Sequence, residues 1–267
     1  MSADPQDAAM AQVEEDQPDA AMVRVEEDQL DAAMARAEGE QPDAAMVRVE
    51  EDRREYSPVR AVRYAGVLSV RSSGGDAQPP PGVDADDYRL ALLEDTYEVV
   101  AGLELVTAAL VLDPPDQPDA EALTWPGTPI VREPALPGAF AALHALGATE
   151  AALISPDAPD LPPLLLGKLF RALGQAPAAA CQSAGGGLVA LAARLPLPPW
   201  LADALTGTDL DVPDALARLR AAAPRHGQIP QGPSWHRLRT PADVALLDPG
   251  LEGWESTRAL LEGRPVA

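Results

Sequence analysis

From Tyr64 onward, short apolar runs alternate with segments of helical periodicity, and this alternation limits the fold more than any other feature. The runs YAGVLSV (64–70), VTAALVL (106–112) and AALI (151–154) have the length and composition of buried strands. Buried strands joined by helices are typical of α/β proteins, whose mostly parallel sheet is covered on both faces. We therefore predict a single three-layer α/β/α domain over residues 60–264.

Helix boundaries can be expected at several polar and glycine residues of this domain. Asp84 is a candidate N-cap for a helix that ends near Gly102. Near the end of the chain, Trp235–Arg239 is predicted as a last strand. Two closing helices are predicted at Pro241–Leu247 and Trp254–Glu262.

Residues 1–55 have a different composition, dominated by a 12-residue repeat that runs from Asp4 to Glu51. They carry 17 acidic residues against 5 arginines, and each repeat unit offers little more than a Met and a few Ala or Val for burial. Low hydrophobicity combined with high charge disfavours a packed core, so we expect a disordered acidic arm. The alternative is an interaction tail that binds a protein partner.

Charge and cysteine content exclude several classes of protein. The formal net charge of −22 argues against a nucleic-acid partner, because nucleic-acid-binding proteins present a basic face. No run is apolar and long enough to span a membrane. Cys181 is the single cysteine, so neither an internal disulfide nor a thiolate zinc cluster can form, which is typical of a reducing compartment. We therefore expect a cytoplasmic protein without nucleic-acid or membrane partners.

The loop SPDAPDLP lies between the run 151–154 and an amphipathic segment at 162–173, which places Asp157 and Asp160 at the carboxyl end of a strand. Ligands bind at that end of the strands in open α/β sheets. One or two carboxylates there can hold Mg²⁺ or Mn²⁺ together with substrate phosphates. The alternative is that both carboxylates only stabilise the fold: Asp160 caps the following helix, and Asp157 accepts backbone N–H groups in its turn. The spacing leaves both interpretations open.

Two glycine-containing segments are further candidates for ligand contacts. The first, RSSGGD, follows the first strand, where backbone N–H groups can form an anion-binding nest beside an arginine. The second, GGG, separates two predicted strands and suits either a close approach of a ligand or a tight turn. The candidate contacts are Arg71, Ser72, Ser73, Gly74, Gly75, Gly185, Gly186 and Gly187.

The order of SPDAPDLP, AGGGLVAL and LRTPADVALLD resembles the nucleotide-diphospho-sugar transferase superfamily, which has the glycosyltransferase-A-like fold. Within it, the chain is similar to the bacterial DUF2064 branch, which is related to molybdenum-cofactor guanylyltransferase. The resemblance covers Tyr64–Leu261. It implies a nucleotidyltransferase- or glycosyltransferase-like activity on a nucleotide, sugar nucleotide or phosphorylated small molecule. It also implies a divalent metal, Mg²⁺ or Mn²⁺, on Asp157.

The chain departs from three motifs of this superfamily. RSSGGDAQPPPG replaces a basic loop and leaves Arg71, and the acid of a D-G-G motif is Ala184. Two acids of the last motif are replaced by Arg237 and Arg239, although Asp243 remains. A guanidinium cannot bind Mg²⁺, but it can hold a phosphate directly. The alternative to an active transferase is therefore a catalytically degenerate scaffold that binds a ligand or a protein.

Overall fold

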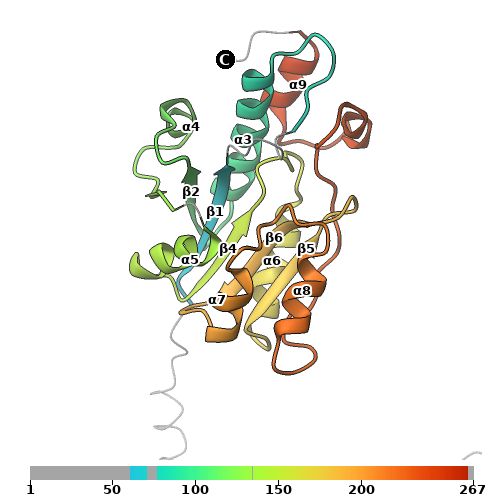
Figure 1. The fold of residues 1–267 in the computed structure, drawn as a ribbon. Coiled ribbons are helices and arrows are strands. Elements are labelled where there is room, and N and C mark those ends of the chain that lie inside the picture. The colour runs from blue at the N-terminus through green and yellow to red at the C-terminus, as the bar shows by residue number, and fades with distance from the viewer. Residues whose placement is uncertain (1–60, 71–76, 134, 264–267) are drawn as a thin grey trace, which may run out of the picture. The chain divides into compact units, whose positions relative to one another are not determined.

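The computed structural model describes residues 61–70, 77–133 and 135–263. Six strands form one sheet in the order β3-β2-β1-β4-β6-β5 (Figure 1). The strands β1 to β4 are parallel to one another, and β6 is antiparallel to both β4 and β5. The strands are β1 (Arg63–Val70), β2 (Thr107–Asp113), β3 (Ile130–Val131), β4 (Glu150–Ile154), β5 (Ala178–Gln182) and β6 (Leu188–Arg194).

Helices cover both faces of this sheet and so complete the predicted three layers. Side chains of α5, α7 and α8 pack with one face, and side chains of α3, α4 and α6 pack with the other. Figure 1 shows α7 on the near side of the sheet and α6 behind it. The helices are α3 (Ala85–Ala101), α4 (Pro118–Ala122), α5 (Leu136–Ala145), α6 (Pro163–Ala172), α7 (Pro199–Leu205), α8 (Ala215–Ala222), the 3₁₀ helix η1 (Pro241–Leu246) and α9 (Glu255–Leu261). The predicted α/β class is confirmed.

Strand β4 shows why the apolar run 151–154 has no polar alternation. Successive residues of a strand point to opposite faces of the sheet. Ala151 and Leu153 belong to the core under α5 and α7, whereas Ala152 and Ile154 belong to the core under α3 and α6. All four are fully buried. Burial on both faces therefore requires an uninterrupted apolar sequence.

Helix α3 joins the sheet to the C-terminal segment. The predicted cap is confirmed, since a carboxylate oxygen of Asp84 accepts the N–H groups of Asp86 and Asp87 at 2.9 and 3.1 Å. One side of α3 packs on the sheet, and the other packs with the end of the chain. This third core contains Tyr88, Leu92, Leu238, Leu247 and Trp254. It holds the residues around 238 beside the sheet.

The predicted last strand at Trp235–Arg239 is wrong. Only an isolated parallel bridge between Ser183 and Trp235 forms there. Beyond it the chain leaves the edge of β5, because the Leu238 N–H donates to the carbonyl of Asp157 at 2.8 Å. The predicted helix after it is a 3₁₀ helix, η1, and the carboxylate of Asp243 accepts the Thr240 N–H at its start at 2.7 Å.

The predicted acidic arm of residues 1–55 lies outside the described residues, so its disorder stays a prediction. Within the described ranges, no helix has the length and apolar character needed to cross a membrane.

Candidate functional site

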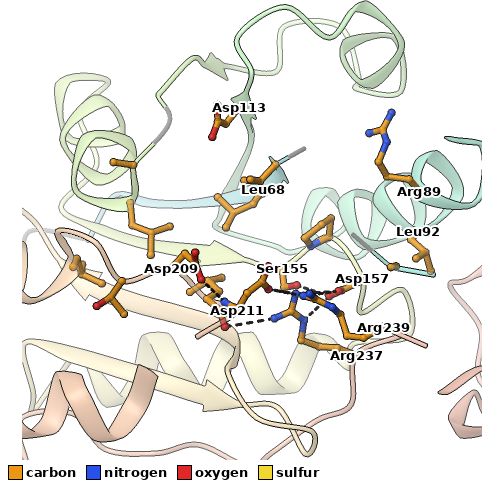
Figure 2. Close-up of a pocket in the computed structure, with 18 of the residues that line it drawn as sticks. Leu68, Arg89, Leu92, Asp113, Ser155, Asp157, Asp209, Asp211, Arg237 and Arg239 are labelled. Carbon is orange, nitrogen blue, oxygen red and sulfur yellow. Dashed lines mark hydrogen bonds and ion pairs between the residues drawn. The ribbon is translucent and has the colours of Figure 1, made fainter. Parts of the chain in front are cut away.

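A cavity of about 360 Å³ opens where β1, β2 and β4 end (Figure 2). Val70, Asp113 and Ser155, at or just beyond the ends of these strands, line one part of it. Another part of the cavity is lined by the loop 207–211 and by Arg237 and Arg239. The carboxyl ends of the strands are where open α/β sheets bind ligands. The volume suits a small-molecule site, for which about 300–1,000 Å³ is usual.

Asp157 lies on the cavity wall, and its carboxylate is paired with Arg237. Nε of Arg237 donates to Oδ1 at 2.6 Å and Nη2 donates to Oδ2 at 2.9 Å. The hydroxyl of Ser155 also donates to Oδ1. Both side chains of the pair are about 95% shielded, at 5% exposure for Asp157 and 4% for Arg237. A parallel two-point contact of this kind fixes the plane of both groups.

The remaining N–H groups of Arg237 also have acceptors. Nη2 donates to a carboxylate oxygen of Asp211 at 2.6 Å. Nη1 donates to the backbone carbonyls of Leu188 at 3.2 Å and Leu210 at 3.5 Å. Arg237 therefore uses its whole guanidinium to join the β4 loop, the start of β6 and the loop that carries Asp211.

Arg239 is more accessible than Arg237. Its side chain is 29% exposed, and Nη1 donates to Asp211 at 2.5 Å and lies 3.5 Å from Oδ2 of Asp157. Burial alone would raise the pKa of Asp211, but the charges of Arg237 and Arg239 outweigh it and hold this pKa below its usual value. Asp211 is therefore ionised and bridges the two guanidiniums.

The predicted roles of Asp160 as a helix cap and of Asp157 as a turn residue are wrong in their details. Helix α6 begins after Pro162 without a side-chain cap. Asp160 instead accepts hydrogen bonds from Nε1 of Trp235 at 3.1 Å and Nε2 of His236 at 2.9 Å. Asp157 takes side-chain donors rather than the backbone N–H groups of its own turn. Both carboxylates thus hold the segment that begins at Trp235, a role that the local spacing could not reveal.

The donors around Asp157 do not fit a divalent metal. A cation bound to a carboxylate oxygen that also accepts from Arg237 would lie about 4 Å from the guanidinium charge. Two unit charges at 4 Å repel by about 4 kcal/mol at an effective dielectric constant of 20, and a divalent ion doubles this to about 8 kcal/mol. Asp157 also belongs to no group of three acidic, histidine or cysteine ligands in the described part of the chain. The implied metal at Asp157 therefore conflicts with this arrangement.

One acidic group does satisfy the spacing for a cation, between α3 and α9. Ligand atoms of Asp95, Glu98 and Glu255 all lie within 4.8 Å of one another. The two oxygens of Asp95 already accept the N–H groups of Ser256 and Thr257, at 3.0 and 2.7 Å. Burial raises the pKa of Asp95 to about 7. This carboxylate therefore anchors the first turn of α9 to α3.

The predicted ligand contacts have two different outcomes. Arg71 and the segment 72–75 lie outside the described residues, and their role in binding phosphate stays a prediction; the flanking Val70 and Ala77 both line the cavity. The segment 185–187 forms the turn between β5 and β6. These glycines do not line the cavity. Gly187 packs against the backbone of Leu210, and Leu210 does line the cavity.

Gly187 is the more tightly packed of two glycines with positive φ in this turn. Its φ is +75°, and a Cβ atom there would lie 2.5 Å from the carbonyl oxygen of Leu210. Its N–H donates to the carbonyl of Pro213 at 3.0 Å. The absence of a side chain lets the turn support the loop that brings Asp211 to Arg237.

Four charged residues of the cavity escaped the sequence analysis, and Asp211 is one of them. Asp113 ends β2, Arg89 lies in the second turn of α3, and Asp209 precedes Asp211 by two residues. The signals for the carboxylates were present, since Asp113 ends an apolar run and TDLD offers two acids at alternate positions. Arg89 had no signal beyond its place in an amphipathic helix.

Comparisons with known proteins support the fold. No protein-family model and no curated protein matches this sequence. A solved structure of a candidate nucleotide-diphospho-sugar transferase from Desulfovibrio desulfuricans G20 is 18% identical with a TM-score of 0.56, over 76% of this chain and 95% of that chain. A 4-diphosphocytidyl-2C-methyl-D-erythritol synthase is 12% identical with a TM-score of 0.50, over 70% of this chain and 97% of that chain.

The corresponding synthase from Anaerococcus prevotii is 14% identical with a TM-score of 0.50, over 70% of this chain and 94% of that chain. Identities this low establish the architecture and leave the activity to the site. The structural neighbours of this chain are thus nucleotide-diphospho-sugar transferases and nucleotidyltransferases, and the chain has their fold.

Proposed function

We propose that the cavity binds a nucleotide or sugar nucleotide, and that the chain is a nucleotidyltransferase- or glycosyltransferase-like protein of the DUF2064 branch. One observation carries this proposal. The cavity lies at the ligand-binding edge of a transferase-like sheet and is lined by a partly exposed guanidinium, Arg239. Guanidinium groups bind phosphate oxygens through paired, charge-assisted hydrogen bonds.

The charges that line the cavity favour a ligand with an anionic part and a hydrogen-bond-donating part. In Figure 2, Arg89 and Arg239 lie toward one side together with Asp157, and Asp113 and Asp209 lie toward the other. A phosphate is attracted to the guanidinium side, whereas carboxylates accept hydrogen bonds from hydroxyl or amino groups. Sugars and nucleobases carry such donors. A nucleotide or sugar nucleotide complements this cavity better than inorganic phosphate does.

Transfer of a phosphorus-linked group depends mainly on positioning and on neutralising charge at phosphate. Arg239 would neutralise charge on a phosphate oxygen, and its ion pair with Asp211 would keep the guanidinium in place. The carboxylate of Asp113 makes no hydrogen bond to a described residue, so it is available to orient a donor hydroxyl. The divalent metal that the resemblance implies has no step in this account, because Asp157 is paired with Arg237.

The second candidate is a scaffold that binds the same ligands without catalysis. The pairing of Asp157 with Arg237 favours it, because this pairing removes the carboxylate on which the resemblance places the metal. The two candidates share the cavity and its ligand class and differ only in turnover.

Calorimetric titration of the full chain with nucleoside mono-, di- and triphosphates and with sugar nucleotides tests the proposal. We expect saturable binding of at least one of them. Arg239→Met should weaken it by about tenfold or more, the value of one charge-assisted hydrogen bond. Arg218→Met is the control, because Arg218 forms an exposed ion pair on α8 with Asp214. Release of pyrophosphate or nucleoside diphosphate with an acceptor panel would then separate the transferase from the scaffold. Absence of binding to every nucleotide would refute both candidates.

A further inference from the structure

The contacts of Arg237 identify it as a fixed charge rather than a ligand-binding arm. All of its N–H groups have acceptors: two carboxylates, on Asp157 and Asp211, and two backbone carbonyls. The residue is only 6% exposed. Burial would lower its pKa, but the carboxylate of Asp157 raises it above the usual value. Arg237 is therefore positively charged at neutral pH.

Charge balance at this wall is complete without a metal ion. Asp157 and Asp211 contribute two negative charges, and Arg237 and Arg239 contribute two positive charges at 2.5–3.5 Å from them. A divalent cation on the same two carboxylates would supply the same charge. Its other task, to attract the ligand's phosphate, falls to Arg239, whose Nε and Nη2 make no hydrogen bond to a described residue.

We propose that the guanidinium of Arg237 takes the place of a divalent cation on Asp157, so that this cavity binds a phosphate-bearing ligand without metal. The identity of the ligand in this inference rests on the proposed function, whereas the absence of a metal site on Asp157 does not. Arg237 is a positioning residue: it holds Asp157, Asp211 and, through Asp211, Arg239. Arg239 is the group that contacts phosphate.

The first test compares nucleotide affinity in EDTA with affinity in millimolar Mg²⁺ or Mn²⁺, on the full chain. We expect dissociation constants that agree within about threefold, and a loss of binding of about tenfold or more in Arg239→Met under both conditions. Binding that tightens by about tenfold or more with metal, and that loses this gain in Asp157→Asn, would overturn the inference while leaving the proposed function intact.

The second test needs no nucleotide. Electron paramagnetic resonance of Mn²⁺ measures how much metal the full chain binds, and Asp157→Asn shows how much of it depends on Asp157. Equal Mn²⁺ binding by wild type and Asp157→Asn supports the inference, and a site lost in the variant overturns it. Asp211→Asn, whose side chain is 36% exposed, is the second variant if Asp157→Asn fails to fold. Absence of nucleotide binding would refute the proposed function, and this test would still decide the metal question.

Discussion

The pair formed by Arg237 and Asp157 yields the prediction with the largest effect. Arg237→Met keeps most of the side-chain length but removes three hydrogen bonds to carboxylates and two to carbonyls. Asp157 stays buried and loses its two-point contact. Breaking a buried pair from one side costs about 3–5 kcal/mol. Arg239 remains 3.5 Å from Asp157, so the lower end, about 3 kcal/mol, is expected.

Urea denaturation followed by tryptophan fluorescence measures this loss. With a dependence of about 2 kcal/mol per molar urea, the midpoint should fall by about 1.5 M. Adding Asp157→Asn to Arg237→Met removes the uncompensated charge, so the double variant should regain part of the loss. Arg218→Met breaks an ion pair that is more than half exposed on both sides and should leave the midpoint unchanged. A midpoint for Arg237→Met equal to that of wild type, or a double variant less stable than Arg237→Met alone, would refute the reasoning.

Three further predictions concern other parts of the domain. Gly187→Ala should cost about 2 kcal/mol or more of folding stability, because the φ of Gly187 is +75° and a Cβ there would lie 2.5 Å from the Leu210 carbonyl oxygen. In the control Gly185→Ala the new Cβ meets nothing within 4 Å, so this variant should be neutral. Urea midpoints of the two variants test the difference. Asp160→Ala leaves Nε1 of Trp235 and the ring of His236 without their acceptor and should cost about 1–3 kcal/mol, with a changed fluorescence maximum; an unchanged emission spectrum and midpoint would contradict it. Burial raises the pKa of Asp95 from 3.8 to about 7, so the folded state binds the Asp95 proton more tightly than the unfolded state does. As pH rises between these two values, the wild type should therefore lose stability relative to Asp95→Asn by about 1.4 kcal/mol per pH unit. Parallel curves of stability against pH for the two proteins would contradict this prediction.

The sequence predicted the layers of the fold because each central strand is apolar on both faces. The run at 151–154 has the length and composition of a strand buried on two sides, and Asp84 marked the start of α3 by its position before an amphipathic segment. The segment Trp235–Arg239 misled for the opposite reason. Its pattern suggests a strand, but its course is set by hydrogen bonds to Asp157 and Asp160, about 80 residues earlier in the chain.

Of the predicted site residues, Asp157 lies on the cavity wall, but its interactions were not predicted. The loop after β4 identified Asp157 at the ligand-binding edge, and the cavity lies there. Its partner is distant in sequence, and nothing near Asp157 indicates that Arg237 meets it with a two-point contact. Asp211 was missed for a related reason, since only the fold shows that its loop reaches both arginines.

A crystal of the full chain soaked with a nucleotide in EDTA tests the central claim most directly. The account predicts electron density for the ligand in the cavity beside β1 and β2, with a phosphate oxygen within hydrogen-bonding distance of Nε or Nη2 of Arg239. Arg237 should remain paired with Asp157, with no cation between them. A ligand bound elsewhere, or a metal ion on Asp157 with Arg237 displaced after a parallel soak in Mn²⁺, would contradict it.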